Sequence, residues 1–203
     1  DNVLAPPPAS KGFVTDIILQ SLEGRLQNVA TLVPLAGHFM NRVRAASRRA
    51  VQHSKTRLTS LEKSQFAFWK ELLKRAHHGI SMNSVIPRVP NCAFRNDACN
   101  YGLGGFSLKT GRAWRYEIPP EHVGKRSINF LEFLAAVVSI MLGIFEGEIQ
   151  RNDNVLSATD NTCTQGWIAK SNFDEAGDQA PLAALAHCLA PVGMLNDIDL
   201  SAI

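Results

Sequence analysis

The hydrophobic pattern of this chain changes its period at the segment Ile86–Pro90, and this change constrains the fold more than any other feature. Before the segment, apolar residues recur every three to five positions, which predicts amphipathic helices. After it, short runs bounded by glycine and proline predict strands, followed by a long apolar helix. Pro87 and Pro90 predict an extended linker, because the residue before a proline disfavours the helical conformation.

The chain of 203 residues is long enough for one ordinary domain or two small ones. We expect a proline-rich lead-in over 1–12, a basic helical segment over 13–85, the linker over 86–91 and an α/β domain over 92–203. Within the helical segment, helices are expected over about 13–32, 35–52 and 60–79. Pro34 marks the first boundary and Ser60 is the expected N-cap of the third helix, whose expected apolar face includes Leu61 and Trp69.

The part after Pro90 predicts strands over 92–96, 102–108, 113–118 and 155–159, with helices over 128–145, 163–170 and 181–189. Three antiparallel strands, a helix, a parallel strand and a helix form an α/β fold with a mixed sheet. The sixteen residues of Phe130–Phe145 carry only one charge, Glu132. A membrane span needs about 20 apolar residues, and a carboxylate is costly in lipid. We therefore expect a buried helix and no membrane partner.

Charge is distributed unevenly along the sequence. Residues 41–80 contain ten Lys and Arg against two acids, whereas residues 146–203 contain two against nine. The basic stretch is interpreted either as a solvated helix face or as a surface for a phosphate backbone, with Arg48 and Arg49 as candidate contacts. Four cysteines without a CxxC pair and scattered histidines argue against structural zinc. With no signal peptide at the start, an intracellular protein with free thiols is expected, in either the nucleus or the cytoplasm.

Three acids occupy positions that do not favour a charge. Asp97 ends the first predicted strand, Glu132 lies in the most apolar helix, and Asp160 follows the predicted buried strand. Strand ends in α/β sheets are where sites are usually built, and clustered carboxylates need a cation such as Mg²⁺. Each acid could instead serve as a cap or turn residue, and Asp160 could N-cap the helix that follows it.

Three blocks make a family resemblance visible: NDACNYGLGGFSLKTGRAWRYEIP, INFLEFLAAVV and SATDNTCTQGWIAKS. Together they resemble the ribonuclease H-like domain of retroelement reverse transcriptases, with Cys99 in the place of the usual serine. The upstream helices are similar to the thumb or connection segment that precedes this domain. The resemblance covers about 18–190 and implies three metal-binding catalytic carboxylates, which are Asp97, Glu132 and Asp160, with Mg²⁺ or Mn²⁺ as the cofactor.

The resemblance implies cleavage of RNA in an RNA–DNA hybrid, within a longer reverse transcriptase polyprotein. Uncharged candidates for substrate contacts near the acids are Asn100, Asn129, Asn161 and Gln165, which could equally be turn and cap residues. The family's fourth carboxylate follows a fifth strand and a loop, and the residues after 190 leave too little room for both, so an altered C-terminal end is expected. Asp199 is the candidate for the fourth metal ligand. Two alternatives stay open: a non-catalytic nucleic-acid-binding module that keeps the fold, and a protein–protein scaffold.

Overall fold

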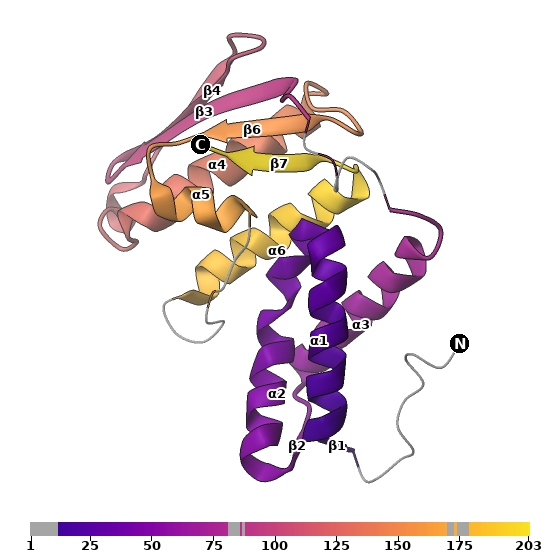
Figure 1. Ribbon diagram of the computed structural model, residues 1–203. Coiled ribbons are helices and arrows are strands. Elements are labelled where there is room, and N and C mark those ends of the chain that lie inside the picture. Colours follow the sequence, from indigo (N-terminus) through magenta and orange to yellow (C-terminus); the bar gives the residue numbers. More distant parts are fainter. Residues whose placement is uncertain (1–11, 81–85, 87, 170–172, 174–178) are drawn as a thin grey trace. The chain divides into compact units, whose positions relative to one another are not determined.

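A computed structural model of the chain describes residues 12–80, 86, 88–169, 173 and 179–203 (Figure 1). The chain divides into two compact units, Asp1–Ile80 and Ser81–Ile203. The division lies five residues before the predicted start of the linker. The predicted lead-in, apart from Gly12, and Lys170 at the end of a predicted helix lie outside the described residues.

Unit 1 is helical, as its sequence period predicts. Its elements are β1 (Phe13–Thr15), α1 (Asp16–Leu32), the 3-10 helix η1 (Pro34–Phe39), α2 (Asn41–His53), β2 (Lys55–Arg57) and α3 (Ser60–Ala76). Trp69 is 1% exposed in the core, and its indole N–H donates to the Phe39 carbonyl at 3.0 Å. Buried Leu19, Ala46 and Ala50 form an apolar cluster between α1 and α2.

Several details of unit 1 differ from the prediction. The first helix begins at Asp16 rather than at residue 13, because Phe13–Thr15 pairs as a short strand with Lys55–Arg57. The second helix begins at Asn41 rather than Leu35, because Pro34–Phe39 forms the tighter 3-10 turn. Thr59 is the N-cap of α3, in a capping box with Glu62 in which each side chain accepts a hydrogen bond from the other residue's backbone N–H. Leu61 is 59% exposed, so it lies outside the buried face of that helix.

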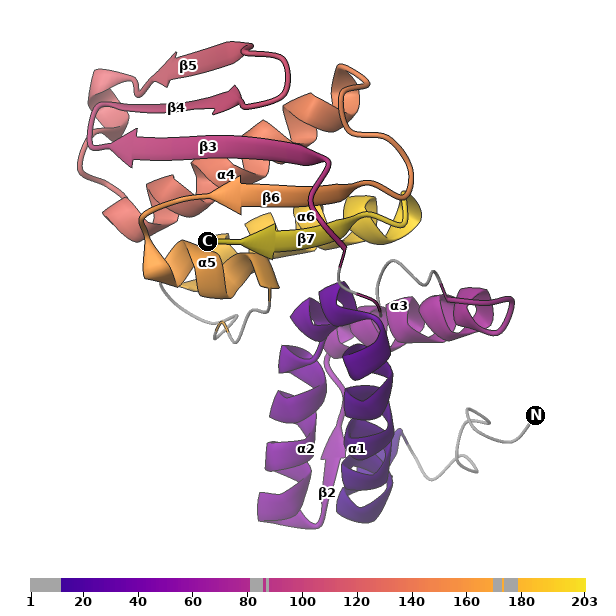
Figure 2. The same cartoon turned by 45° about the horizontal axis from the view of Figure 1, so that its top comes forward.

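Unit 2 has the predicted α/β fold with a mixed sheet. Its strands are β3 (Cys92–Cys99), β4 (Gly102–Ser107), β5 (Ala113–Glu117), β6 (Asn154–Ala158) and β7 (Asp199–Ala202), and its helices are η3 (Pro120–His122), α4 (Ile128–Phe145), α5 (Thr162–Ala169) and α6 (Ala180–Leu195). The strand order is β5-β4-β3-β6-β7. β3, β4 and β5 pair antiparallel, whereas β6 is parallel to both β3 and β7. Figure 2 shows α4 and α6 behind these strands.

The α4 helix supplies much of the core of unit 2. Phe133, Val137 and Ile140 of this helix pack with Phe94 of β3 and Val155 of β6. By length and composition alone α4 could cross a membrane, with a mean hydropathy of 2.2, but half of its residues are buried inside the fold. Its apolar character is therefore explained by packing against the sheet.

The fifth strand corrects a prediction about the C-terminal segment. Of the strand and loop for which too little room was expected, the strand does form, because α6 continues through Pro191 to Leu195 and only three residues connect it to β7. One of these is Asp197, whose φ of 52° gives the left-handed turn. The Ile203 carbonyl accepts a hydrogen bond from the Thr159 N–H at 2.9 Å, so β7 ends beside the residue before Asp160.

Candidate metal site

The register of two parallel strands brings Asp97 and Asp160 together. The last pair between β3 and β6 is Arg95 with Ala158. Asp97 lies two residues beyond Arg95, and Asp160 lies two residues beyond Ala158. Because the strands are parallel and in register, both carboxylates project from the same edge, where β6 has ended and β3 continues to Cys99.

Glu132 reaches the same edge from the first turns of α4. Ser127 is the N-cap of this helix and accepts a hydrogen bond from the Phe130 N–H at 3.3 Å. Glu132 Oε1 accepts from the Ala98 N–H at 3.2 Å, and the same N–H donates to Asp97 Oδ1 at 2.8 Å. One backbone amide of β3 therefore orients two of the three carboxylates.

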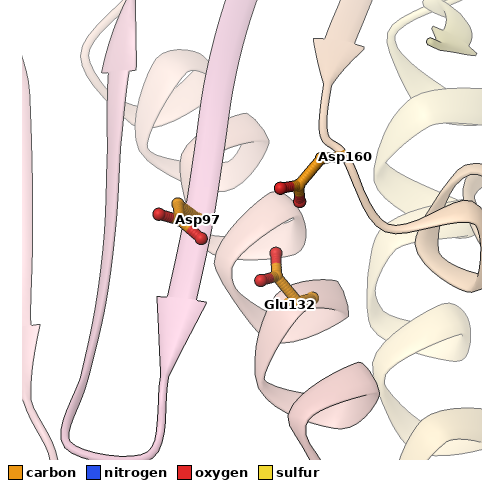
Figure 3. A group of neighbouring side chains, drawn as sticks. All are labelled: Asp97, Glu132 and Asp160. Carbon is orange, nitrogen blue, oxygen red and sulfur yellow. The ribbon is translucent and has the colours of Figure 1, made fainter.

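The three carboxylates form one compact cluster. One oxygen from each of Asp97, Glu132 and Asp160 lies within 4.8 Å of the others. Figure 3 shows the three side chains converging from β3, α4 and the segment after β6. Asp97 and Asp160 are exposed, whereas Glu132 is only 4% exposed.

Burial and repulsion together make Glu132 a weak acid. Burial, together with the nearby charges of Asp97 and Asp160, raises its pKa to about 7, although the hydrogen bond from the Ala98 N–H acts in the opposite direction. Its second oxygen, Oε2, is buried and accepts no hydrogen bond from a described residue. A buried carboxylate oxygen without a partner costs free energy, which a bound cation would recover.

The donor set fits a hard divalent cation. All three side chains offer carboxylate oxygens, which Mg²⁺ prefers and Mn²⁺ accepts, and the cluster includes no thiol or imidazole. The buried Glu132 Oε2, which accepts no hydrogen bond from a described residue, also fits this cation because it is free to act as a ligand. The arrangement could hold a cation at a sheet edge that exposed Asp97 and Asp160 leave open to a large substrate.

Three of the uncharged residues predicted beside the acids do lie there, and their side chains make hydrogen bonds within unit 2. Asn161 is the N-cap of α5, because its Oδ1 accepts from the Thr164 N–H at 3.0 Å, and its side-chain amide donates to Asn129 Oδ1 at 2.8 Å. The Gln165 side chain donates to the Thr159 carbonyl at 2.9 Å. These contacts match the cap-and-turn alternative, with Asn161 rather than Asp160 as the cap. Asn100 is exposed in the turn between β3 and β4.

Asp199 lies at the other end of the sheet, so the prediction that it is the fourth ligand is wrong. It is the first residue of β7 and pairs with Asn154, the first residue of β6, whereas Asp160 follows the last residue of that strand. Burial raises the pKa of Asp199, and the charge of Arg88 opposes this shift. Asp199 therefore belongs to the end of the sheet away from the cluster.

The two arginines predicted to contact nucleic acid differ in their surroundings. Arg49 donates two hydrogen bonds to buried Glu62, from Nη1 to Oε1 at 2.6 Å and from Nη2 to Oε2 at 2.8 Å. It therefore holds α2 against α3, which makes it a structural residue. Arg48 is exposed and makes no ion pair with a described residue.

Sequence reasoning missed the Ala98 amide, which contacts both Asp97 and Glu132. A backbone donor carries no residue-type signal, so no sequence pattern indicates it. It also missed the cations that share a sheet face with Asp97. That signal was present, since Arg95 lies two positions before Asp97 and side chains alternate along a strand.

No protein-family model matches the sequence, and no curated protein matches it significantly. The structure is similar to the foamy viral protease-reverse transcriptase dRH in complex with double-stranded DNA, at 13% identity and a TM-score of 0.36, over 100% of this chain and 36% of that one. It is also similar to the foamy viral protease-reverse transcriptase in complex with an RNA/DNA hybrid, at 13% identity and a TM-score of 0.37, over 100% of this chain and 26% of that one.

A third similar structure is the native Prototype Foamy Virus protease-reverse transcriptase, at 12% identity and a TM-score of 0.36, over 98% of this chain and 25% of that one. The chain thus spans between a quarter and little more than a third of the length of these proteins. Because the likeness is distant, we base the functional proposal on the carboxylate cluster.

Proposed function

We propose that unit 2 is a divalent-metal-dependent nuclease of the ribonuclease H type, which cleaves RNA in an RNA–DNA hybrid as part of a retroelement reverse transcriptase. The observation that carries the proposal is the convergence of Asp97, Glu132 and Asp160 from three elements within 4.8 Å. The three sequence blocks that resemble the family contribute one of these acids each.

In this proposal, the three carboxylates hold Mg²⁺ or Mn²⁺ at the sheet edge. A divalent ion there would polarise the phosphate and lower the cost of forming the attacking nucleophile. Glu132 supplies the buried anchor through Oε2, while the exposed Asp97 and Asp160 face the substrate. The Ala98 N–H orients Asp97 and Glu132, so their oxygens are positioned before the ion arrives.

A second candidate function is a non-catalytic nucleic-acid-binding module. Two observations favour it: the described residues place three rather than four carboxylates in the cluster, and unit 1 exposes cations such as Arg48, Lys55 and Lys70. Binding of this kind would weaken steeply with salt, because each neutralised phosphate releases a counterion.

Cleavage of a labelled RNA–DNA hybrid tests the proposal directly. The full chain is assayed with Mg²⁺ and with Mn²⁺, beside Asp97→Asn and Asp160→Asn variants. We expect slow cleavage that requires the ion, is faster with Mn²⁺, and is lost in both variants. Cleavage that survives Asp160→Asn would show that other residues catalyse the reaction. Binding without any cleavage by the unmodified chain would favour the second candidate.

A further inference from the structure

The sheet of unit 2 has an outward face that the strand register defines. Cys92, Phe94 and Asn96 of β3 are buried, so the alternate residues Ala93, Arg95 and Asp97 point to the other side. Directly paired residues share a face, which assigns further positions to it. These are Gly104 and Phe106 of β4, Ala113 and Arg115 of β5, and Leu156 and Ala158 of β6.

This face is open in unit 2. None of these outward residues is buried, and Figure 2 shows α4 and α6 on the far side of the strands. Phe106 is 38% exposed although β4 is an interior strand with neighbours on both sides. Parallel strands such as β3 and β6 are normally covered on both faces, so an uncovered face calls for an occupant.

The charges on this face identify the chemistry of that occupant. Arg95 lies two residues before Asp97 on the same face, about 7 Å along the strand. Arg115 of β5 pairs with Gly104 of β4, and Gly104 pairs with Asp97 of β3. Arg115 therefore lies two strand spacings, or about 10 Å, from Asp97. Neither arginine forms an ion pair with a described residue. Gly104 has no side chain, so nothing projects between Arg115 and Asp97.

We propose that the open face binds a nucleic-acid strand that leaves the carboxylate cluster, with Arg95 and Arg115 on its phosphates and Phe106 between them as an apolar contact. The inference rests on the proposed function, because it takes the cluster as the point where the strand is cut. Arginine suits this role, since its planar guanidinium binds phosphate oxygens in a bidentate manner. An exposed aromatic ring beside cations is the usual surface for nucleic-acid strands.

The test measures binding of an RNA–DNA hybrid to the full chain in EDTA, which prevents metal-dependent cleavage. Arg95→Ala with Arg115→Ala should weaken binding by about tenfold or more at 0.1 M salt, because each lost contact is a charge-assisted hydrogen bond. The slope of log affinity against log salt should fall in magnitude by about 2. Arg95→Lys with Arg115→Lys should keep the slope.

Arg112→Ala is the control, because it removes one exposed cation of unit 2 that is not assigned to the open face. Arg112 is exposed and pairs with Glu146 beyond the end of α4, far along that helix from Glu132. An equal loss of affinity in Arg112→Ala, or unchanged affinity and slope in the double alanine variant, would overturn the inference. Self-association that Phe106→Ser abolishes without changing hybrid binding would also overturn it, because the face would then bind a second copy.

The melting temperature with and without Mn²⁺ separates this inference from the proposed function. The double alanine variant should fold normally and keep the full Mn²⁺-dependent shift, since neither arginine belongs to the cluster. If the unmodified chain shows no Mn²⁺ shift while the arginine effects persist, the metal proposal fails and the binding face stands.

Discussion

Two glutamates, one in each unit, are buried to the same extent and have opposite surroundings. Glu62 of unit 1 and Glu132 of unit 2 are each 4% exposed. Both oxygens of Glu62 accept hydrogen bonds, from the Arg49 guanidinium and from the Thr59 N–H. Among the described residues, the Ala98 N–H is the one hydrogen-bond donor to Glu132, which faces the like charges of Asp97 and Asp160.

The two environments shift the acidity in opposite directions. Burial alone would raise the pKa of Glu62, but its hydrogen bonds to Arg49 and Thr59 hold that pKa below the ordinary value of 4.5. Burial and neighbouring carboxylates raise the pKa of Glu132 to about 7. Burial therefore does not distinguish a structural carboxylate from a functional one. The distinction lies in whether the protein itself supplies the compensating charge.

The largest effect is expected from removing the partner of Glu62. Arg49→Ala leaves a buried carboxylate without a counter-charge, which should lower the free energy of unfolding of unit 1 by about 3 kcal/mol. We place the value at the lower end of the range for buried pairs because the Arg49 side chain is 38% exposed. Chemical denaturation followed by fluorescence measures it, since Trp69 reports on unit 1.

Arg48→Ala is the control for this prediction, because Arg48 is the exposed neighbour of Arg49. A surface substitution of this kind should change stability by no more than about 0.5 kcal/mol. An equal loss of stability in the two variants would mean that the Arg49–Glu62 pair makes no specific contribution. Glu62 would then no longer serve as the compensated carboxylate with which Glu132 is compared.

The next effect concerns the cation that Glu132 lacks. Mg²⁺ or Mn²⁺ at a hundred times its dissociation constant should stabilise unit 2 by about 2.7 kcal/mol. Glu132→Gln should abolish this gain, and it should stabilise the metal-free protein at neutral pH by relieving repulsion. Glu62→Gln should keep the metal-dependent gain, since Glu62 lies in the other unit. Thermal unfolding with and without the ion measures both, and a gain that persists in Glu132→Gln would remove Glu132 from the site.

Glu132 and Glu62 should affect the stability of the protein in different ranges of pH. Between pH 4.5 and about 7, the unfolded chain has released the Glu132 proton while the folded protein retains it. Stability should therefore fall as pH rises through this range, by up to about 1.4 kcal/mol per pH unit. Glu62 has a lowered pKa, so its contribution is present above 4.5 and is lost only at more acidic pH.

Denaturation at several pH values, without metal, checks this prediction. The difference between the unmodified chain and Glu132→Gln isolates Glu132 from every other titrating group. That difference should grow from pH 4.5 to 7 and then level off. A difference that stays constant over this range of pH would show that Glu132 has an ordinary pKa. Burial and the charges of Asp97 and Asp160 would then not disfavour the ionised form of Glu132.

The sequence predicts most of unit 2 because its signals are local. Alternating strands, the apolar helix and the acids at strand ends each follow from residue type and spacing, and the structure brings Asp97, Glu132 and Asp160 together as expected. Neither the β7 strand nor the N–H of Ala98 could be predicted. β7 has only four residues and is stabilised by pairing with β6, which is distant in sequence.

Unit 1 shows the limit of charge counting. The sequence distinguishes a basic stretch from an acidic one, but it does not indicate which arginines bind acceptors within the protein itself. Arg42, Arg44 and Arg49 all donate to acceptors within unit 1, and Arg49 does so as half of an ion pair with buried Glu62. Which partner each cation meets depends on how α1, α2 and α3 pack, so local pattern alone does not determine it.

The smallest effect on stability is expected at Asn161, the polar residue next to Asp160. Like Glu62, Asn161 has hydrogen-bond partners within the fold for its side-chain polar groups. Its Oδ1 caps α5 through the Thr164 N–H, and its amide donates to Asn129. Asn161→Ala should therefore lower the stability of unit 2 by about 1 kcal/mol, as loss of an N-cap does. Asn161→Ser should restore most of that stability, because a serine hydroxyl caps equally well.

Both Asn161 variants should keep the Mn²⁺-dependent melting shift, because Asn161 contributes no oxygen to the cluster. Hybrid binding measured on the same variants decides between a cap and a substrate contact. If the serine variant recovers stability but binds the hybrid as weakly as the alanine variant, Asn161 also contacts nucleic acid. If it recovers both, the residue acts through the fold alone, and the carboxylates remain the polar groups beside this sheet edge that the protein leaves uncompensated.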